Sequence, residues 1–146
     1  LDLYCGMGAF TVFFAKLGCE VVGIEENGHA VNEARANAAL NGVPTGARFL
    51  QGRVENVLAS EAGRSALAKA EVVFLDPPRK GSDEAALEAV AQAGVRDVWY
   101  LSCNPATLAR DLAYLRERGY ALDSVTPFDM FPHTGHVEAL ATMHHV

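Results

Sequence analysis

The sequence lacks any apolar run long enough to cross a membrane, and its cysteines follow no metal-binding or disulfide pattern. No stretch approaches the roughly 20 consecutive apolar residues that a membrane span requires, so no membrane partner is expected. The three cysteines, Cys5, Cys19 and Cys103, are odd in number and show no Cys-x-x-Cys spacing. This argues against a disulfide framework and a zinc site, and it favours a reducing, cytoplasmic setting.

Positive charge is also scarce, because 12 Lys and Arg residues stand against 18 Asp and Glu residues, for a net charge of −6. A domain that binds nucleic acid mainly through phosphate contacts is usually basic. If a nucleic acid is the substrate, we expect much of the affinity for its backbone to come from another part of the protein or from a local patch. We expect a monomer that does not bind DNA.

The length of 146 residues, half of them apolar, is that of one domain with a full hydrophobic core. The chain begins Leu-Asp-Leu-Tyr, without an initiator methionine and within an expected strand. We therefore take residues 1–146 as one catalytic domain of a longer protein.

Strand and helix signals alternate along the chain. Short apolar runs predict strands, and segments with helical spacing that stop at glycine or asparagine predict helices. The expected strands are 1–4, 20–24, 47–50, 71–75, 97–101, 120–129 and 137–145. The expected helices are 9–17, 27–40, 56–70 with an interruption near Gly63, 83–93 and 105–118.

This alternation predicts an α/β fold, with a mainly parallel seven-stranded sheet and helices on both faces. The last two expected strands have no helix between them, so they should pair as an antiparallel hairpin at one edge. In an open sheet of this kind, ligands bind at the carboxyl ends of the strands.

Two features at that end of the sheet suggest a nucleotide-type site. A strand runs through Gly6 and Gly8 into a helix, and glycine lets the backbone approach a ligand. Glu25 ends the next strand, about 20 residues on, where an acid can accept hydrogen bonds from both ribose hydroxyls. Ala-Phe-Thr follows in place of the third glycine of the dinucleotide fingerprint, which favours S-adenosylmethionine over NAD. The alternative is an ordinary glycine turn and a surface glutamate.

A third feature is Asp76, which ends an apolar strand and precedes Pro-Pro-Arg-Lys-Gly. Two prolines fix φ and remove two N–H donors, so the chain leaves the sheet in a stiff loop. Arg79 and Lys80 form the only adjacent basic pair of the chain. Either Asp76 lies at the cofactor or at a substrate base and the pair faces phosphates, or the segment is a rigid turn with a solvated charge pair.

The fourth feature is Cys103, which comes just after a strand and just before a helix. A thiol near a helix N-terminus is more easily deprotonated and is a better nucleophile. Ser102, Asn104 and Pro105 flank it with polar and turn-forming groups. The alternative is a buried structural cysteine.

The segment 128–138 joins the last two expected strands. Glu138 lies early in an apolar strand, where a carboxylate is costly unless it has a partner or a function. His133 and His136 could suggest a metal, but no Cys or carboxylate stands at ligand spacing, so no metal is expected. We expect His133 to shape the loop or contact substrate, and Phe131 could stack on a target base.

Four segments resemble a known family. They are Leu-Tyr-Cys-Gly-x-Gly, Asp-Pro-Pro-Arg-Lys-Gly, Ser-Cys-Asn-Pro-Ala-Thr-Leu-Ala-Arg-Asp and Asp-Met-Phe-Pro-His-Thr-Gly-His-Val-Glu. They look like motifs of the bacterial RNA 5-methyluridine methyltransferases (the TrmA and RumA type), and the match runs from residue 1 to about residue 140. The resemblance implies a class I (Rossmann-like) methyltransferase fold that uses S-adenosylmethionine.

The resemblance also implies residue roles. Cys103 is implied as the nucleophile that adds to C6 of a uridine, and Glu138 as the base that removes the C5 proton. The cofactor-contacting positions are then Tyr4, Gly6, Gly8, Ala9, Glu25, Arg53 and Asp76. Arg53 stands where relatives often carry a smaller polar residue that reaches the adenine. The expected substrate contacts are Arg79, Lys80, Asn104, Phe131 and His133.

The family's RNA-binding domain, and the cysteine cluster that holds an iron–sulfur centre in some members, are not in this sequence. We favour 23S-type ribosomal RNA over transfer RNA as the substrate. A cytosine-5 RNA methyltransferase is one alternative, but its Thr-Cys-Ser motif and second cysteine are not seen. An exocyclic-amine methyltransferase would need neither Cys103 nor Glu138. A module that binds S-adenosylmethionine and docks RNA without turnover is the non-enzymatic alternative.

Overall fold

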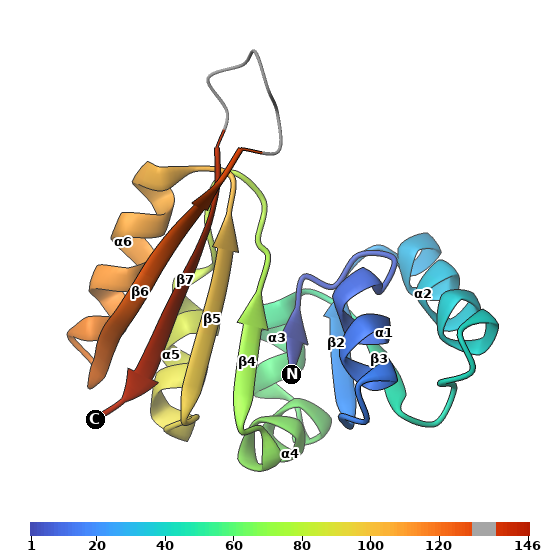
Figure 1. Cartoon of the computed structure of the whole chain (residues 1–146). Helices are drawn as coiled ribbons and strands as arrows, with labels where there is room; N and C mark the ends of the chain where they lie inside the picture. The colour runs from blue at the N-terminus through green and yellow to red at the C-terminus, as the bar shows by residue number, and fades with distance from the viewer. Residues whose placement is uncertain (130–136) are drawn as a thin grey trace. The chain divides into compact units, whose positions relative to one another are not determined.

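The computed structural model describes residues 1–129 and 137–146, which form two compact units, Leu1–Ala66 and Leu67–Val146 (Figure 1). The first unit contains β1 (Asp2–Leu3), α1 (Ala9–Lys16), β2 (Val21–Glu25), α2 (Gly28–Leu40), β3 (Ala47–Gln51), α3 (Val54–Ala59) and most of α4 (Glu61–Lys69). The second contains β4 (Val72–Leu75), α5 (Glu84–Ala93), β5 (Asp97–Ser102), α6 (Pro105–Arg116), β6 (Tyr120–Phe128) and β7 (Glu138–His145).

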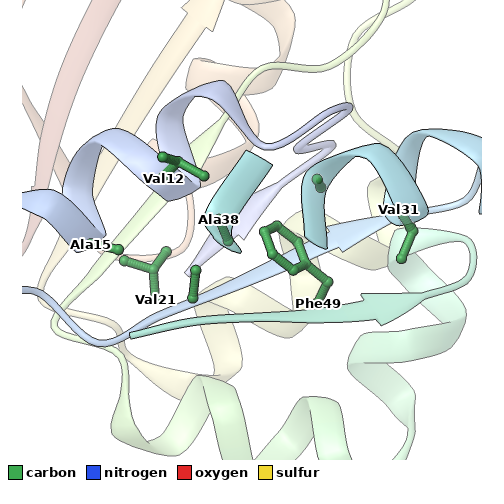
Figure 2. Close-up of a cluster of buried hydrophobic side chains, with 8 residues drawn as sticks. Val12, Ala15, Val21, Val31, Ala38 and Phe49 are labelled. Atoms are coloured by element: carbon green, nitrogen blue, oxygen red, sulfur yellow. The ribbon is translucent and has the colours of Figure 1, made fainter. Parts of the chain in front are cut away.

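Three parallel strands in the order β3-β2-β1 form the sheet of the first unit. Helices α1 and α2 cover one face of this sheet, and α3 lies on the other (Figure 1). A buried cluster joins the covering helices to the sheet, and Figure 2 shows Phe49 of β3 within it. The members of this cluster are Val12, Ala15, Val21, Val31, Ala34, Ala38, Ala47 and Phe49. The small side chains of α2 let this helix lie close to the strands.

In the second unit the strand order is β4-β5-β7-β6. Strands β4 and β5 are parallel, whereas β7 runs antiparallel to both of its neighbours. Helices α5 and α6 lie side by side on one face of these strands (Figure 1). Glu88 of α5 links the two helices, because it accepts hydrogen bonds from Tyr114 at 2.8 Å and from Arg118 at 2.6 Å.

The structure confirms the predicted alternation of strands and helices and the antiparallel pairing of the last two strands. The interruption near Gly63 was predicted at the wrong place, because the chain breaks at Ser60, between α3 and α4. The Ser60 hydroxyl accepts a hydrogen bond from the Gly63 N–H at 3.2 Å and so caps α4. Gly63 lies inside α4, where a Cβ would come within 1.9 Å of the Val57 carbonyl oxygen.

None of the helices in the described part of the chain has the length and apolar character needed to cross a membrane.

Candidate active site

The turn after β1 contains the two predicted ligand-binding glycines. Gly6 and Gly8 have positive φ angles of 53° and 81°, and Tyr4 shares this region at 65°. A Cβ on Gly8 would lie 3.0 Å from the Ala34 Cβ and 3.1 Å from the Phe49 ring, whereas a Cβ on Gly6 would meet nothing within 4 Å. Gly8 therefore lets the turn pack closely on α2 and β3. Gly6 borders open space, where a ligand can approach the backbone.

Glu25, at the end of β2, is held by this turn. Its Oε2 accepts a hydrogen bond from the Gly6 N–H at 3.1 Å, and its Oε1 accepts one from the Asn27 N–H at 2.8 Å. The two backbone donors orient the carboxylate, which is half-buried. Each oxygen of a carboxylate can accept more than one hydrogen bond, so Glu25 can also accept from a ribose diol. The residues present thus fit an adenosine ligand.

Two other predicted cofactor residues of this unit, Ala9 and Arg53, are more exposed than Glu25. Ala9 is exposed at the first position of α1, directly after the glycine turn. Arg53 precedes α3 and forms an ion pair with Glu55, and 58% of its side chain is exposed. The pairing directs the Arg53 guanidinium toward the start of its own helix.

Cys5 lies in the same turn but belongs to the core of the first unit. Its side chain packs against the buried cluster, and a Cβ added at Gly23 would come within 2.8 Å of its Sγ. Burial, followed by the negative charges of Asp2 and Glu25, raises the pKa of the Cys5 thiol to about 12. Cys5 is therefore protonated near neutral pH and is a structural cysteine.

In the second unit, three chemically important residues lie at one end of the strands. Ser102, the last residue of β5, pairs with Ala139 of the antiparallel β7. Cys103 directly follows Ser102 and Glu138 directly precedes Ala139, so both residues adjoin the last pair of the β5–β7 ladder. Asp76 follows β4, the parallel neighbour of β5. Burial and, second, the charge of Glu138 raise the pKa of Asp76 to about 6, as expected when two carboxyl groups lie close together.

A tight turn holds the backbone on both sides of Cys103. The Asn104 N–H donates to the Ser102 hydroxyl oxygen at 3.0 Å, and that hydroxyl donates to the Asn104 carbonyl at 3.1 Å. Ser102 is buried, whereas Cys103 is half-buried. Pro105 begins α6 directly afterwards. The thiol is therefore attached to a fixed backbone and remains partly accessible.

Asn104, a predicted substrate contact, uses both ends of its amide within the protein. Its Oδ1 accepts a hydrogen bond from the Ala106 N–H at 3.1 Å and so caps α6. Its Nδ2 donates to the Arg79 carbonyl at 3.0 Å. Arg79 and Lys80 themselves are exposed. The end of β5 and the Asp-Pro-Pro-Arg-Lys loop are thus joined directly.

Asp111, a buried carboxylate on α6, was not predicted from the sequence. It is 1% exposed and accepts hydrogen bonds from the Ser82 N–H at 2.8 Å and from the Tyr100 hydroxyl. A signal was present in the sequence, because Asp111 lies in the same helical stripe as Leu108 and Leu115. An acid in an apolar stripe is costly unless it is partnered, and such a position therefore indicates a buried network.

Two predicted substrate residues, Phe131 and His133, lie outside the described residues. Within residues 1–129 and 137–146, no group of three or more His, Cys, Asp or Glu side chains could hold a metal ion. The three cysteines are free thiols.

A family model described as tRNA (Uracil-5-)-methyltransferase matches residues 1–145. The chain belongs to this family. A Bacillus cereus protein named as an uncharacterized RNA methyltransferase is 45% identical over 146 residues, which are 100% of this chain and 31% of that protein. A Gloeobacter violaceus protein, also named as an uncharacterized RNA methyltransferase, is 46% identical over 98% of this chain and 30% of its own length.

Among solved structures, the Pyrococcus abyssi tRNA (uracil-54, C5)-methyltransferase in complex with S-adenosyl-L-homocysteine is similar, with a TM-score of 0.85 and 34% identity. The alignment covers 97% of this chain and 33% of that one. A TehB-like SAM-dependent methyltransferase from Corynebacterium glutamicum matches at a TM-score of 0.70 and 15% identity, over 99% of this chain and 78% of its own, which shows the fold alone. These findings confirm the resemblance and the class I methyltransferase fold. The chain spans about a third of the length of the B. cereus and P. abyssi proteins.

Proposed function

We propose that the protein containing this chain is an S-adenosylmethionine-dependent RNA methyltransferase that methylates C5 of a uridine, with Cys103 as its nucleophile. The observation that carries this proposal is the β5–β7 register in a member of the uracil-5-methyltransferase family, because Cys103 and Glu138 adjoin its last pair, Ser102 and Ala139. An exocyclic-amine methyltransferase would need neither residue, and a cytosine-5 RNA methyltransferase would be expected to carry a Thr-Cys-Ser motif and a second cysteine.

The glycine turn and Glu25 would hold the adenosine part of S-adenosylmethionine. Gly6 leaves room beside the backbone, and the oriented carboxylate of Glu25 can accept hydrogen bonds from the ribose hydroxyls. The other cofactor contacts remain predictions; they are Tyr4, Gly8, Ala9, Arg53 and Asp76. When bound, S-adenosylmethionine supplies an electrophilic methyl group. The P. abyssi enzyme, whose structure contains S-adenosyl-L-homocysteine, supports this choice of cofactor.

The chemistry follows from the two residues at the end of β5 and the start of β7. The Cys103 thiolate adds to C6 of uracil, and the electron pair displaced from the C5–C6 double bond makes C5 nucleophilic. After C5 has taken the methyl group, Glu138 removes the C5 proton. The returning electron pair restores the double bond and expels the thiolate. Positioned proton transfer of this kind contributes a typical 10²–10⁴-fold, roughly, to the rate.

The target uridine must be unstacked for this reaction, because C6 is hidden within a helix. The exposed basic pair, Arg79 and Lys80, would contact phosphates near the target. The description of the family and the name of the P. abyssi enzyme both specify transfer RNA. The preference for ribosomal RNA, the monomeric state and the cytoplasmic location stay predictions.

The proposal is tested with the full-length protein, S-adenosylmethionine and unmodified transcripts of transfer RNA and 23S ribosomal RNA. We expect 5-methyluridine in one of the two, measured by nucleoside mass spectrometry. RNA that carries 5-fluorouridine should form a stable covalent complex, because fluorine at C5 cannot be removed as a proton. Peptide mapping should place the bond on Cys103.

Each other result would reject part of the proposal. A 5-methylcytidine or N-methyl product would reject the uridine reaction, and a bond to another residue would reject the nucleophile. Cofactor binding without any methylated product from either transcript would favour the module that docks RNA without turnover.

A further inference from the structure

The loop between β4 and α5 is tied to one face of α6 through its backbone. Asn104 and Thr107 both donate hydrogen bonds to the Arg79 carbonyl, at 3.0 and 3.2 Å. Arg110 donates to the next carbonyl, that of Lys80, at 3.0 Å. The three donors are spaced three residues apart, so they share one face of the helix. The backbone that carries the exposed basic pair is thus held at two successive peptide groups.

Asp111 anchors the far end of this loop. Its Oδ2 accepts hydrogen bonds from the Ser82 N–H at 2.8 Å and from the Tyr100 hydroxyl, and its Oδ1 accepts from Arg110 Nε at 2.8 Å. A buried carboxylate is costly unless its oxygens are well partnered, and here both oxygens are engaged. Asp111 therefore fixes the loop directly through Ser82 and indirectly through Arg110.

Gly81 shows how closely the loop lies on the helix. Its φ is 84°, and a Cβ there would come within 2.7 Å of Asp111 Oδ2 and 2.4 Å of Arg110 Nη2. A cavity of about 440 Å³ borders the loop on the side of Lys80, Gly81 and Ser82. A loop released from Asp111 would therefore have room to move.

We propose that Asp111 is a positioning residue for RNA binding, because it holds the loop backbone in the conformation that presents Arg79 and Lys80 to phosphates. This rests on the proposed function, in which the basic pair contacts RNA. In a chain with a net charge of −6, Arg79 and Lys80 are the only adjacent basic pair, so the direction of these two cations matters for contact with phosphates. Long cationic side chains lose affinity when their attachment points are not fixed.

The test is a double-mutant cycle in the full-length protein. Asp111→Asn keeps the size of the side chain but removes its charge and one of its acceptor groups. We expect this variant to weaken RNA binding by roughly fivefold to thirtyfold. In an Arg79→Ala, Lys80→Ala background the same change should have less than about a twofold effect, because the groups that Asp111 positions are gone. The probe is the transcript, transfer RNA or 23S fragment, that wild type binds more tightly, followed by fluorescence anisotropy.

Glu88→Gln is the matched control. Glu88 is also a helix carboxylate that accepts from one tyrosine and one arginine, Tyr114 and Arg118, but it does not bond the loop. Glu88→Gln should therefore leave RNA affinity unchanged.

Thr107→Val is a second variant, which removes one bond to the Arg79 carbonyl without disturbing a buried charge. It should weaken RNA binding less than Asp111→Asn and lose its effect in the same background.

An equal effect of Asp111→Asn in both backgrounds, or no effect in either, would overturn the inference. If Asp111→Asn does not fold, the same two outcomes for Thr107→Val decide it. The binding cycle does not depend on the reaction. A wild type that forms no 5-methyluridine rejects the proposed function while the coupling can still be measured, and 5-methyluridine without coupling rejects the positioning role alone.

Discussion

Cys5 and Cys103 both lie within two residues of the end of a strand and ahead of a helix, yet their surroundings differ. Cys5 packs into the core of the first unit, where burial and two nearby acids raise the pKa of its thiol to about 12. Cys103 is partly accessible, in a turn held by Ser102, and adjoins the strand pair that Glu138 also adjoins. Position at a strand end is therefore not enough to make a nucleophile, because the neighbouring groups decide whether the thiol can react.

Replacing each cysteine by alanine is the strongest test of this difference. Cys103→Ala should reduce methylation to background and abolish the covalent complex with 5-fluorouridine RNA. Cys5→Ala should keep turnover and only lower the free energy of unfolding, by about 1 kcal/mol, because it removes one core atom. Methyl incorporation measures turnover, and denaturing gels detect the covalent RNA complex. Urea unfolding measures the change in stability of Cys5→Ala. Turnover in Cys103→Ala would reject the mechanism.

The two glycines beside Cys5 should separate packing from ligand binding. Gly8→Ala adds a methyl group against Ala34 and Phe49 at a positive φ, so we expect a loss of about 2–4 kcal/mol in the free energy of unfolding. Gly6→Ala carries a similar backbone strain but no clash, and should cost about 1 kcal/mol. It should instead weaken S-adenosylmethionine binding, measured by calorimetry. Equal losses of stability would contradict this division.

Near Cys103, Asp76 predicts a pH dependence. Its pKa is about 6 in the folded protein and 3.8 in the absence of perturbation, so the folded state holds this proton more tightly. Protonated Asp76 therefore contributes to the free energy of unfolding. This contribution is full below the pKa of the unfolded state and is lost as pH rises through about 6. Asp76→Asn removes this loss, and it should raise the free energy of unfolding near pH 8 by about 1 kcal/mol relative to wild type, after solvent screening. Near pH 4 the difference should vanish.

Urea unfolding at several pH values measures this effect. Asp129→Asn is the control, because it removes one negative charge from an exposed position. A parallel pH dependence in wild type and Asp76→Asn would show that Asp76 has an ordinary pKa.

The smallest expected effect concerns the turn around Cys103. Ser102→Ala removes the acceptor of the Asn104 N–H in a buried position, which should cost about 1 kcal/mol of stability. It should also slow formation of the 5-fluorouridine complex a few-fold, measured by rapid quench, because the thiol loses its fixed backbone. Ser124→Ala is the control, since it removes an exposed hydroxyl that bonds Thr142. Identical rates for Ser102→Ala and wild type would show that the turn does not position Cys103.

Much of the fold was predictable because its signals are local. Apolar runs, helix-stopping glycines and the proline pair mark the elements within one or two residues of where they lie, except at Ser60. That break depends on a close contact between Gly63 and the Val57 carbonyl, and no local pattern shows which of two small residues ends a helix. The Asp111 network was missed because its partners, Ser82 and Tyr100, come from distant segments.

The sequence by itself determined that strands alternate with helices, that Glu25, Asp76 and Cys103 follow strands, and which family the motifs resemble. Only the tertiary structure decided that Cys103 and Glu138 adjoin the same strand pair, that burial and the charge of Glu138 raise the pKa of Asp76 to about 6, and that burial raises the pKa of Cys5 to about 12. Strand-end positions follow from patterns along the chain. Strand register, burial and the distances between charges depend on how distant segments pack. They set the chemistry of Cys5, Asp76 and Cys103.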